Sequence, residues 1–310
     1  MNVLDRVRAG CATVAARARH VTIHPEAIEG LAADLDPVEP PLLPEERLAG
    51  DDEAVAASVL AWNAVNFGSG WFPDLCKRPG LSGARSLAAA WSDHVARDGA
   101  PSAAWLAEAG AARCGRLFDQ PYPGPVDDLL DLFARAWRDL GALLAGRFGG
   151  SAAALIRSAG GSAADLVDIL GTMPLAHDVA RHRGVEVPLY KRAQITVSHL
   201  ARATGGEGLG AFADADRLTA FADNLVPHVL RMAGILSYDD GLAAHIAAGT
   251  RLAPGSAEEV EIRACGVHAV ELLSGPSGLP PAAIDHQLWQ RGQDAAIKAV
   301  PRHRCRCSWY

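Results

Sequence analysis

The sequence lacks any run of apolar residues long enough to cross a membrane. No stretch approaches the roughly 18 consecutive apolar residues that a membrane-spanning helix needs. The N-terminus also lacks the apolar segment of a cleavable signal, because Arg6, Arg8, Arg17 and Arg19 interrupt it. The six cysteines are scattered and form no disulfide-like framework. We therefore expect a cytoplasmic protein that does not bind a membrane.

An excess of basic residues is absent as well. The 310 residues include 29 Lys and Arg against 36 Asp and Glu, which gives a formal net charge of −7. Nucleic-acid binding relies on neutralising many phosphates, so this balance argues against nucleic acid as a partner. A small phosphate ester needs only one local group of cations. We therefore expect a small-molecule ligand.

Familiar catalytic motifs are missing too. The chain has no Gly-x-Ser-x-Gly elbow, no Walker loop and no Gly-x-Gly-x-x-Gly after a strand. His177, Asp178 and His182 invite interpretation as a metal-dependent phosphohydrolase site. The two histidines are five residues apart, however, which is not one helical face, and no further pair completes a ligand set. We expect no metal there.

A second group of potential metal ligands lies near the C-terminus. His303, Cys305 and Cys307 alternate with arginines, so on a strand they would share one face. Three such ligands lack a fourth, and neighbours on one strand suit the tetrahedral geometry of zinc poorly. The alternation instead predicts a buried terminal strand. We expect neither a metal nor a cofactor in this protein.

The remaining pattern is typical of helices joined by loops, because Ala, Leu and Arg dominate and Gly or Pro punctuate them. Ser151 and Ser162 are placed as N-caps of two helices, and Ser256 with Glu259 forms a capping box for a third. Further helices are expected over residues 2–19, 54–65, 81–97, 102–114 and 126–147, and extended segments over 21–23 and 183–188. The sequence predicts a mainly α fold, a single globular helical domain over residues 1–310 with a few short strands.

Residues 257–273 predict a central helix that is apolar over most of its circumference. Arg263 lies one turn after Glu259, so the two can form an internal ion pair. Glu271 falls on the same stripe as apolar residues, which predicts a buried and paired carboxylate.

The first candidate site lies between residues 187 and 238. On a helix, an apolar stripe that includes Leu189 and Val197 faces away from Lys191, Gln194 and Ser198, which predicts one packed face and one cationic face. About thirty residues later, an aromatic ring and a carboxylate, Phe221 and Asp223, precede the expected helix start at Pro227. Two cations, Lys191 and Arg192, a lone carboxylate and an aromatic ring suit a phosphorylated ligand with a flat ring. The alternative is an amphipathic surface helix and a turn whose Asp caps the next helix.

The second candidate site lies near the C-terminus. Asp285 and Trp289 are one turn apart on an expected helix, and Asp294 follows. The pattern predicts a carboxylate and a ring that face one cavity, or an ordinary acid near a helix N-terminus. Asn66 and Phe67 begin a loop with three aromatic rings between glycines, which is either a packed loop or part of a pocket wall.

Several short motifs keep a common order along the chain: Phe148-Gly149-Gly150-Ser151, Tyr190-Lys191-Arg192-Ala193-Gln194, Phe221-Ala222-Asp223 with Pro227, Glu259-Val260-Glu261-Ile262-Arg263-Ala264-Cys265, Asp285 with Leu288-Trp289, and Val300-Pro301 to Tyr310. Together they resemble the queuosine salvage proteins, the family of queuosine 5′-phosphate N-glycosylase/hydrolases. The resemblance runs over nearly the whole chain and is strongest from residue 149 onward.

This resemblance implies a fold similar in outline to helical DNA glycosylases. It also implies hydrolysis of the N-glycosidic bond of queuosine 5′-monophosphate, which releases the base queuine. Asp223 matches the Phe-Ala-Asp carboxylate and is the expected catalytic residue, as nucleophile or as electrostatic stabiliser. Phe221, Asp285 and Trp289 are expected to hold the base.

The resemblance also suggests residues for the rest of the substrate. Lys191, with Arg192 as a helper, is expected to hold the 5′-phosphate, and Tyr190 and Asp294 are further expected substrate-binding residues. The chain departs from the family pattern at Gln290, where relatives carry an acid, and it has no histidine between positions 35 and 51.

Three functions remain open at this point. The first is an N-ribosyl hydrolase of the nucleotide. The second is a non-catalytic binder of queuine or its nucleotide, in which Asp223 only accepts hydrogen bonds. The third is a metal-dependent phosphohydrolase that uses His177, Asp178 and His182.

Overall fold

The computed structural model describes residues 1–310 and consists of helices with two small sheets. The helices are α1 (Val3–Ala15), α2 (Ile28–Ala33), α3 (Asp52–Ala64), α4 (Gly83–Asp98), α5 (Ala103–Ala107), α6 (Ala111–Leu117), α7 (Asp127–Arg147), α8 (Ala152–Arg157), α9 (Ala163–Leu170), α10 (Lys191–Ala203), α11 (Val226–Met232), α12 (Asp240–Ala247), α13 (Ala257–Ser277), α14 (Pro281–Arg291) and α15 (Ala295–Ala299). The strands are β1 (Val21–Ile23), β2 (Val179–His182), β3 (Val185–Pro188) and β4 (Leu236–Tyr238). The expected mainly α fold is confirmed.

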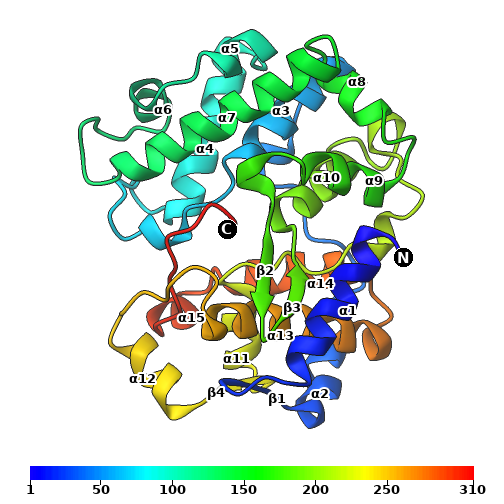
Figure 1. Cartoon of the computed structure of the whole chain (residues 1–310), viewed down its shortest axis with the longest axis vertical. Helices are drawn as coiled ribbons and strands as arrows, with labels where there is room; N and C mark the ends of the chain where they lie inside the picture. Colours follow the sequence, from blue (N-terminus) through cyan, green and yellow to red (C-terminus); the bar gives the residue numbers. More distant parts are fainter.

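The helices form an upper and a lower group in Figure 1. In the upper group α7 packs against α3, α5 and α6, and in the lower group α13 packs against α1, α2, α11 and α14. The β2–β3 hairpin lies between the groups, and α10 packs against α3 and α9. The 84 residues of the main hydrophobic cluster come from both groups, so the groups share one core.

Each sheet is an antiparallel pair. Strand β1 pairs with β4, which brings Val21 opposite Tyr238. Strands β2 and β3 form a hairpin closed by Arg183 and Gly184, both with positive φ, as the tight turns of twisted hairpins require. The expected extended segment 183–188 contains only β3, because its first residues form this turn.

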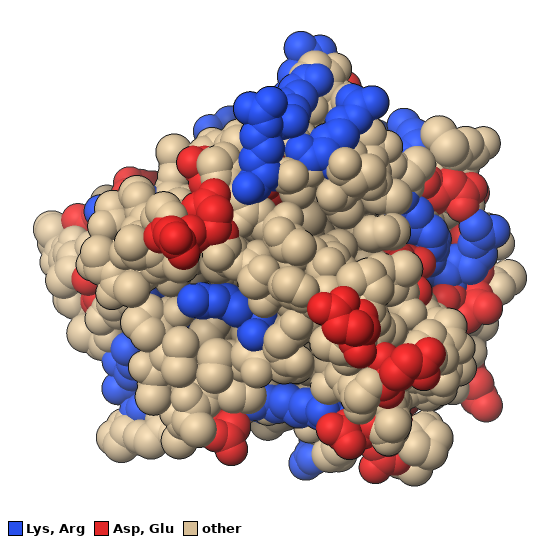
Figure 2. All heavy atoms as spheres, turned by 90° about the horizontal axis from the view of Figure 1, so that it is seen from below, with Lys and Arg blue, Asp and Glu red and all other residues tan.

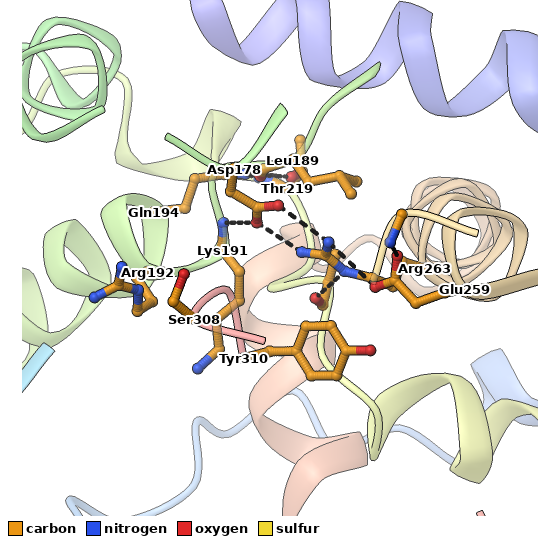
Figure 3. A network of polar contacts seen from close by, with 12 residues as sticks. Asp178, Leu189, Lys191, Arg192, Gln194, Thr219, Glu259, Arg263, Ser308 and Tyr310 are labelled. Atoms are coloured by element: carbon orange, nitrogen blue, oxygen red, sulfur yellow. Dashed lines mark hydrogen bonds and ion pairs between the residues drawn. The ribbon is translucent and has the colours of Figure 1, made fainter. Parts of the chain in front are cut away.

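Buried charges on α13 tie the hairpin to the core. Arg263 donates two hydrogen bonds to Asp178, of 3.0 and 2.6 Å, and lies 3.5 Å from Glu259 (Figure 3). Glu261 pairs with His182 at 3.0 Å. A charged side chain that is buried away from water needs a partner of opposite charge, so these contacts fix α13 against β2 and the residue before it. The predicted ion pair between Arg263 and Glu259 is confirmed.

Some local predictions differ from the structure. Residues 102–114 form two helices rather than one, because α5 ends at its C-cap Glu108 and α6 begins at Ala111, after its N-cap Gly110. His303 and Cys305 are buried as the alternation predicted, but no strand forms there, because no neighbouring strand pairs with this segment. Glu271 pairs with Arg8 at 2.9 Å and is half-buried.

The C-terminal segment positions the aromatic loop. It runs from α15 up between the two groups (Figure 1). The carbonyl oxygen of Tyr310 accepts hydrogen bonds from the backbone N–H groups of Gly68 and Ser69, at 3.0 and 3.4 Å. These contacts hold the loop after α3 at the boundary between the groups, where the candidate site lies.

Candidate active site

Several elements surround a cavity of about 820 Å³ that is partly open to solvent. It is formed by the C-terminal end of α3 and the aromatic loop, the N-terminal part of α4, one side of α10 along its length, the segment around residue 223, α14 and residues 43–46. Most of the predicted site residues line it, namely Lys191, Phe221, Asp223, Asp285 and Trp289. Asn66 and Phe67 also line it, so the aromatic loop is part of the wall.

Asp223 is buried and presents one oxygen to the cavity. Its Oδ1 accepts hydrogen bonds from the backbone N–H groups of Leu225 and Val226, at 2.8 and 2.9 Å, just before α11. The N-cap residue of α11 is Leu225, so this oxygen of Asp223 holds the turn before the helix instead of being the predicted helix cap. Oδ2 accepts no hydrogen bond from the protein and is free for a ligand. Burial raises the pKa of Asp223, and the charge of Lys191 opposes that shift.

Lys191 is a buried cation that lines the same cavity as this carboxylate. Tyr190 adopts a left-handed conformation, with φ of 48°, and Lys191 is the first residue of α10. The Lys191 backbone N–H donates to Asp178, whereas its side chain points away from Asp178 (Figure 3). The ammonium group donates a 3.0 Å hydrogen bond to the carbonyl of Asn66. Burial lowers the pKa of Lys191 to about 8, and the charge of Asp223 opposes this most strongly.

Asp285 supplies a second carboxylate to the same cavity. Its Oδ1 accepts a 2.9 Å hydrogen bond from the backbone N–H of Phe221, which joins α14 to the Phe221–Asp223 segment. Burial raises the pKa of Asp285 well above its ordinary value, and the nearby charge of Asp223 adds to the shift. Two close carboxylates favour a state in which one keeps its proton. Lys191 and two backbone N–H groups favour Asp223 as the ionised one.

Aromatic side chains form the walls on both sides. The ring centroid of Phe221 lies 5.6 Å from that of His286, and the guanidinium carbon of Arg85 lies 5.0 Å from the ring centroid of Trp289. Burial lowers the pKa of His286 to about 3, so its ring is neutral at physiological pH. The cavity therefore offers flat apolar surfaces beside buried polar groups, which suits a heteroaromatic ring.

The sequence reasoning missed acidic residues on the opposite wall. Glu46 is paired with Arg202 at 2.8 Å, but Oε2 of its neighbour Glu45 is buried without a partner. Both residues belong to a single helical turn (Pro44–Glu46) in the Pro-rich connection. Such a segment has no periodicity that indicates which side chains point inward. His199 and His286 were missed as well, although both line the cavity.

Three predicted substrate-binding residues lie outside the cavity. Arg192 is buried and donates to the carbonyls of Ala64 and Leu175, because it follows Lys191 and so points about 100° away around α10 (Figure 3). The rings of Tyr190 and His177 pack edge to face, with centroids 6.0 Å apart. Asp294 is exposed and caps α15, with Oδ1 2.7 Å from the N–H of Ala296. Arg192 is therefore not placed to help Lys191 hold a ligand.

The residues of the metal interpretation have structural partners. Asp178 binds Arg263 and His182 binds Glu261, and both pairs are buried. No group of three or more His, Cys, Asp or Glu side chains lies close enough to hold a metal ion. None of the helices combines the length and apolar character needed to cross a membrane.

Buried carboxylates, a buried lysine and aromatic walls around one cavity define a mainly α protein with a site for a small aromatic ligand. A family model described as queuosine salvage protein matches residues 49–310, and the chain belongs to this family.

Individual relatives carry a more specific name. The chain is 45% identical over 188 residues to a queuosine 5′-phosphate N-glycosylase/hydrolase of Sphaerobacter thermophilus, a match that covers 59% of this chain and 58% of the relative. It is 33% identical over 191 residues to the mouse protein of that name, covering 57% of this chain and 56% of the relative. The bovine protein of that name is 28% identical over 284 residues, which cover 84% of this chain and 83% of the relative. The first two matches thus span little more than half of those relatives.

Proposed function

We propose that this protein hydrolyses the N-glycosidic bond of queuosine 5′-monophosphate and releases queuine and ribose 5-phosphate. The names of its relatives support this substrate. The observation that carries the proposal is the free Oδ2 of Asp223, which faces a cavity with aromatic walls and lies near a buried lysine. We also propose that the enzyme acts in the cytoplasm.

The chemistry explains why a carboxylate is needed. Queuine is a 7-deazaguanine, so the leaving base lacks the N7 that purine glycosidases protonate. The C1′–N bond must therefore break with positive charge developing on the ribose. The ionised Asp223 stabilises this charge, either through space or by forming a bond to C1′. Water supplies the oxygen at C1′, and one of its protons ends on the base.

Lys191 and Asp223 act as a pair in this scheme. The ammonium group favours the ionised form of Asp223, against the burial that raises its pKa. A buried carboxylate has few competing water contacts, so its interaction with developing positive charge is stronger than in solvent. The pocket therefore strengthens the attraction between the Asp223 carboxylate and the positive charge that develops on the ribose.

The base fits between the aromatic walls. Stacking on Phe221 and Trp289 contributes about 1–3 kcal/mol per base. The free oxygens of Asp285 and Glu45 accept hydrogen bonds from N–H groups of the base and its side arm. Because its pKa is raised, Asp285 can also donate a proton to a base nitrogen when it is protonated.

A small nucleotide is the proposed ligand, rather than nucleic acid. The net charge of −7 disfavours binding to a polyanion. On the face shown in Figure 2, acidic and basic side chains occur in separate small groups, and no basic surface extends across it.

The direct test is incubation of purified protein with queuosine 5′-monophosphate, with and without a chelator. We expect free queuine and ribose 5-phosphate in both samples, and Asp223→Asn protein is the matched negative control. Tight binding of the nucleotide without turnover would indicate a binding protein. Release of inorganic phosphate that stops on chelation would indicate a phosphohydrolase. Either of these two results would refute the proposal.

A further inference from the structure

The Pro-rich segment of residues 37–48 covers one side of the cavity, and we call it the strap. Its residues Leu43, Glu45 and Glu46 line the cavity, and the two glutamates are buried. The helical turn within the strap packs against α4 and α10. Val38 and Arg47 of the same segment are exposed, so the strap lies between this side of the cavity and solvent.

The backbone of the strap has few connections to the rest of the protein. Four prolines, Pro37, Pro40, Pro41 and Pro44, have no backbone N–H to donate and hold φ nearly fixed, which makes the strap stiff. Those N–H groups of the strap that form hydrogen bonds donate within the strap or to Asp36. A segment without backbone bonds to its neighbours opens at a lower free energy than the helices around it.

Both ends of the strap are fixed. Before it, the side chain of Gln287 on α14 accepts a 2.8 Å hydrogen bond from the N–H of Asp36 and donates a 2.7 Å one to its carbonyl oxygen. After it, Asp51 caps α3 and accepts a 2.9 Å hydrogen bond from the N–H of Ala54. The strap can therefore move about two fixed ends, as lids of active sites do.

Between these ends, one side chain of α10 holds the strap. Arg202 donates hydrogen bonds to Oε1 of Glu46 at 2.8 Å, to Oε2 of Glu39 at 3.0 Å and to the carbonyl oxygen of Pro40 at 3.0 Å. The Arg202 side chain is only 7% exposed, so its bonds to the two carboxylates are charge-assisted and have little competition from water. No other side chain from outside the strap donates a hydrogen bond to it.

The other groups of the wall do not share this role. Nε2 of His199 lies 3.8 Å from Glu46, which is longer than a hydrogen bond. Burial lowers the pKa of His199 to about 4, so its ring is neutral at physiological pH. Glu45 leaves its Oε2 without a partner. The hydrogen bonds between the strap and the body of the protein therefore depend on Arg202.

We propose that the strap is a lid over the acidic side of the cavity and that Arg202 is the positioning residue that keeps it closed. When these bonds are formed, Glu45 faces the ligand. When they break, the stiff strap moves away about its two ends and the cavity opens to solvent. The inference rests on the proposed function, since the ligands that pass the lid are the nucleotide and its base. The closed lid keeps bulk water away from the N-glycosidic bond.

Hydrogen exchange tests the role of Arg202 without any ligand. The double variant Arg202→Gln/Glu46→Gln removes the ionic bonds but leaves neither charge buried alone, so it should fold. We expect the amides of the strap to exchange roughly tenfold or more faster than in wild type, while those of α7 and α13 keep their rates. Arg157→Gln, which breaks an exposed ion pair with Asp52 just beyond the strap, is the matched control and should leave exchange in the strap unchanged. Unchanged exchange in the strap of the double variant, or an equal increase in α7 and α13, would overturn the inference.

Binding kinetics of queuine test whether the strap is a lid. Trp62 and Trp289 line the cavity, so stopped-flow fluorescence can follow binding. We expect both the association and the dissociation rate constants to rise roughly tenfold in the double variant. Arg202→Lys should give intermediate values, because an ammonium group can hold Glu46 but lacks the fork that also reaches Glu39.

The outcomes separate the lid from the proposed function. Faster dissociation with unchanged association would mean that the variant only loses contacts to the ligand, and would overturn the lid, as would two unchanged rate constants. The expected rate constants in a protein whose wild type does not cleave the nucleotide would refute the proposed function alone. A wild type that cleaves the nucleotide but whose variant shows wild-type rate constants would refute the lid alone. A wild type that does not bind queuine would refute both.

Discussion

The backbone N–H of Phe221 donates a 2.9 Å hydrogen bond to the Oδ1 of Asp285. This bond connects two motifs that lie 64 residues apart in the sequence, and it orients the carboxylate of Asp285. The segment that carries Asp223 also holds Asp285 through a backbone hydrogen bond. The distance between the two carboxylates is therefore set partly by the backbone and not by flexible side chains alone. The base-binding groups and the catalytic carboxylate therefore form one preorganised unit.

The two buried charges of the cavity, Lys191 and Asp223, predict a bell-shaped pH dependence of kcat/KM. Burial raises the pKa of Asp223, so activity falls at low pH as this carboxylate takes up a proton. Burial lowers the pKa of Lys191 to about 8, so activity falls above that pH as the ammonium group loses its charge. Initial rates at low substrate concentration over pH 4 to 10 measure both limbs.

The Lys191→Gln variant shows which residue causes each limb of the pH profile of kcat/KM. In Lys191→Gln the decline near pH 8 should disappear. The acidic limb should move to higher pH, since the cation that lowers the pKa of Asp223 is gone. An alkaline limb that persists at the same pH in this variant would show that another group titrates there.

Glu45→Gln should separate substrate binding from stability. Oε2 of Glu45 is buried without a partner, and burial raises the pKa of this residue, so the carboxylate is costly in the free protein. We expect thermal unfolding of Glu45→Gln at the wild-type temperature or above. Loss of a charged acceptor for the base should lower kcat/KM by roughly tenfold or more.

Glu46→Gln is the matched control for that variant. This change removes half of the buried pair with Arg202 and should lower the melting temperature. If Glu45→Gln instead destabilises the protein as much as Glu46→Gln does, Glu45 has a structural role and the base-binding assignment is wrong.

Arg263→Met tests the buried charge network of α13. The substitution leaves Asp178 and Glu259 without their cation, and breaking such a pair costs about 3–5 kcal/mol. Urea unfolding should therefore show a much lower midpoint with an unchanged slope. Arg97→Met, at an exposed ion pair, should leave the free energy of unfolding close to the wild-type value. Similar unfolding free energies for the two variants would contradict this account of the core.

Local chemistry explains which structural predictions succeeded. Ser151 and Ser162 cap helices because each hydroxyl accepts from the N–H three residues later, and this geometry depends only on neighbouring residues. Asp285 and Trp289 face the same cavity because one helical turn brings them to the same side. Such contacts follow from spacing within one element.

Contacts between distant segments explain the failures. The predicted polar face of α10 is buried, because Gln194 bonds to Thr219, 25 residues away. Periodicity defines the faces of a helix but not what covers them, so it could not place Arg192 against the carbonyls of Ala64 and Leu175.

The most direct measurement of the central claim is the rate of queuine release by Asp223→Asn at saturating queuosine 5′-monophosphate. The substituted amide keeps an oxygen that can accept from Leu225 and Val226, so the protein should fold and melt near the wild-type temperature. It removes the charge on the free oxygen, and we expect kcat to fall by about 10²–10³ or more. A folded Asp223→Asn protein that releases queuine at nearly the wild-type rate would contradict the account.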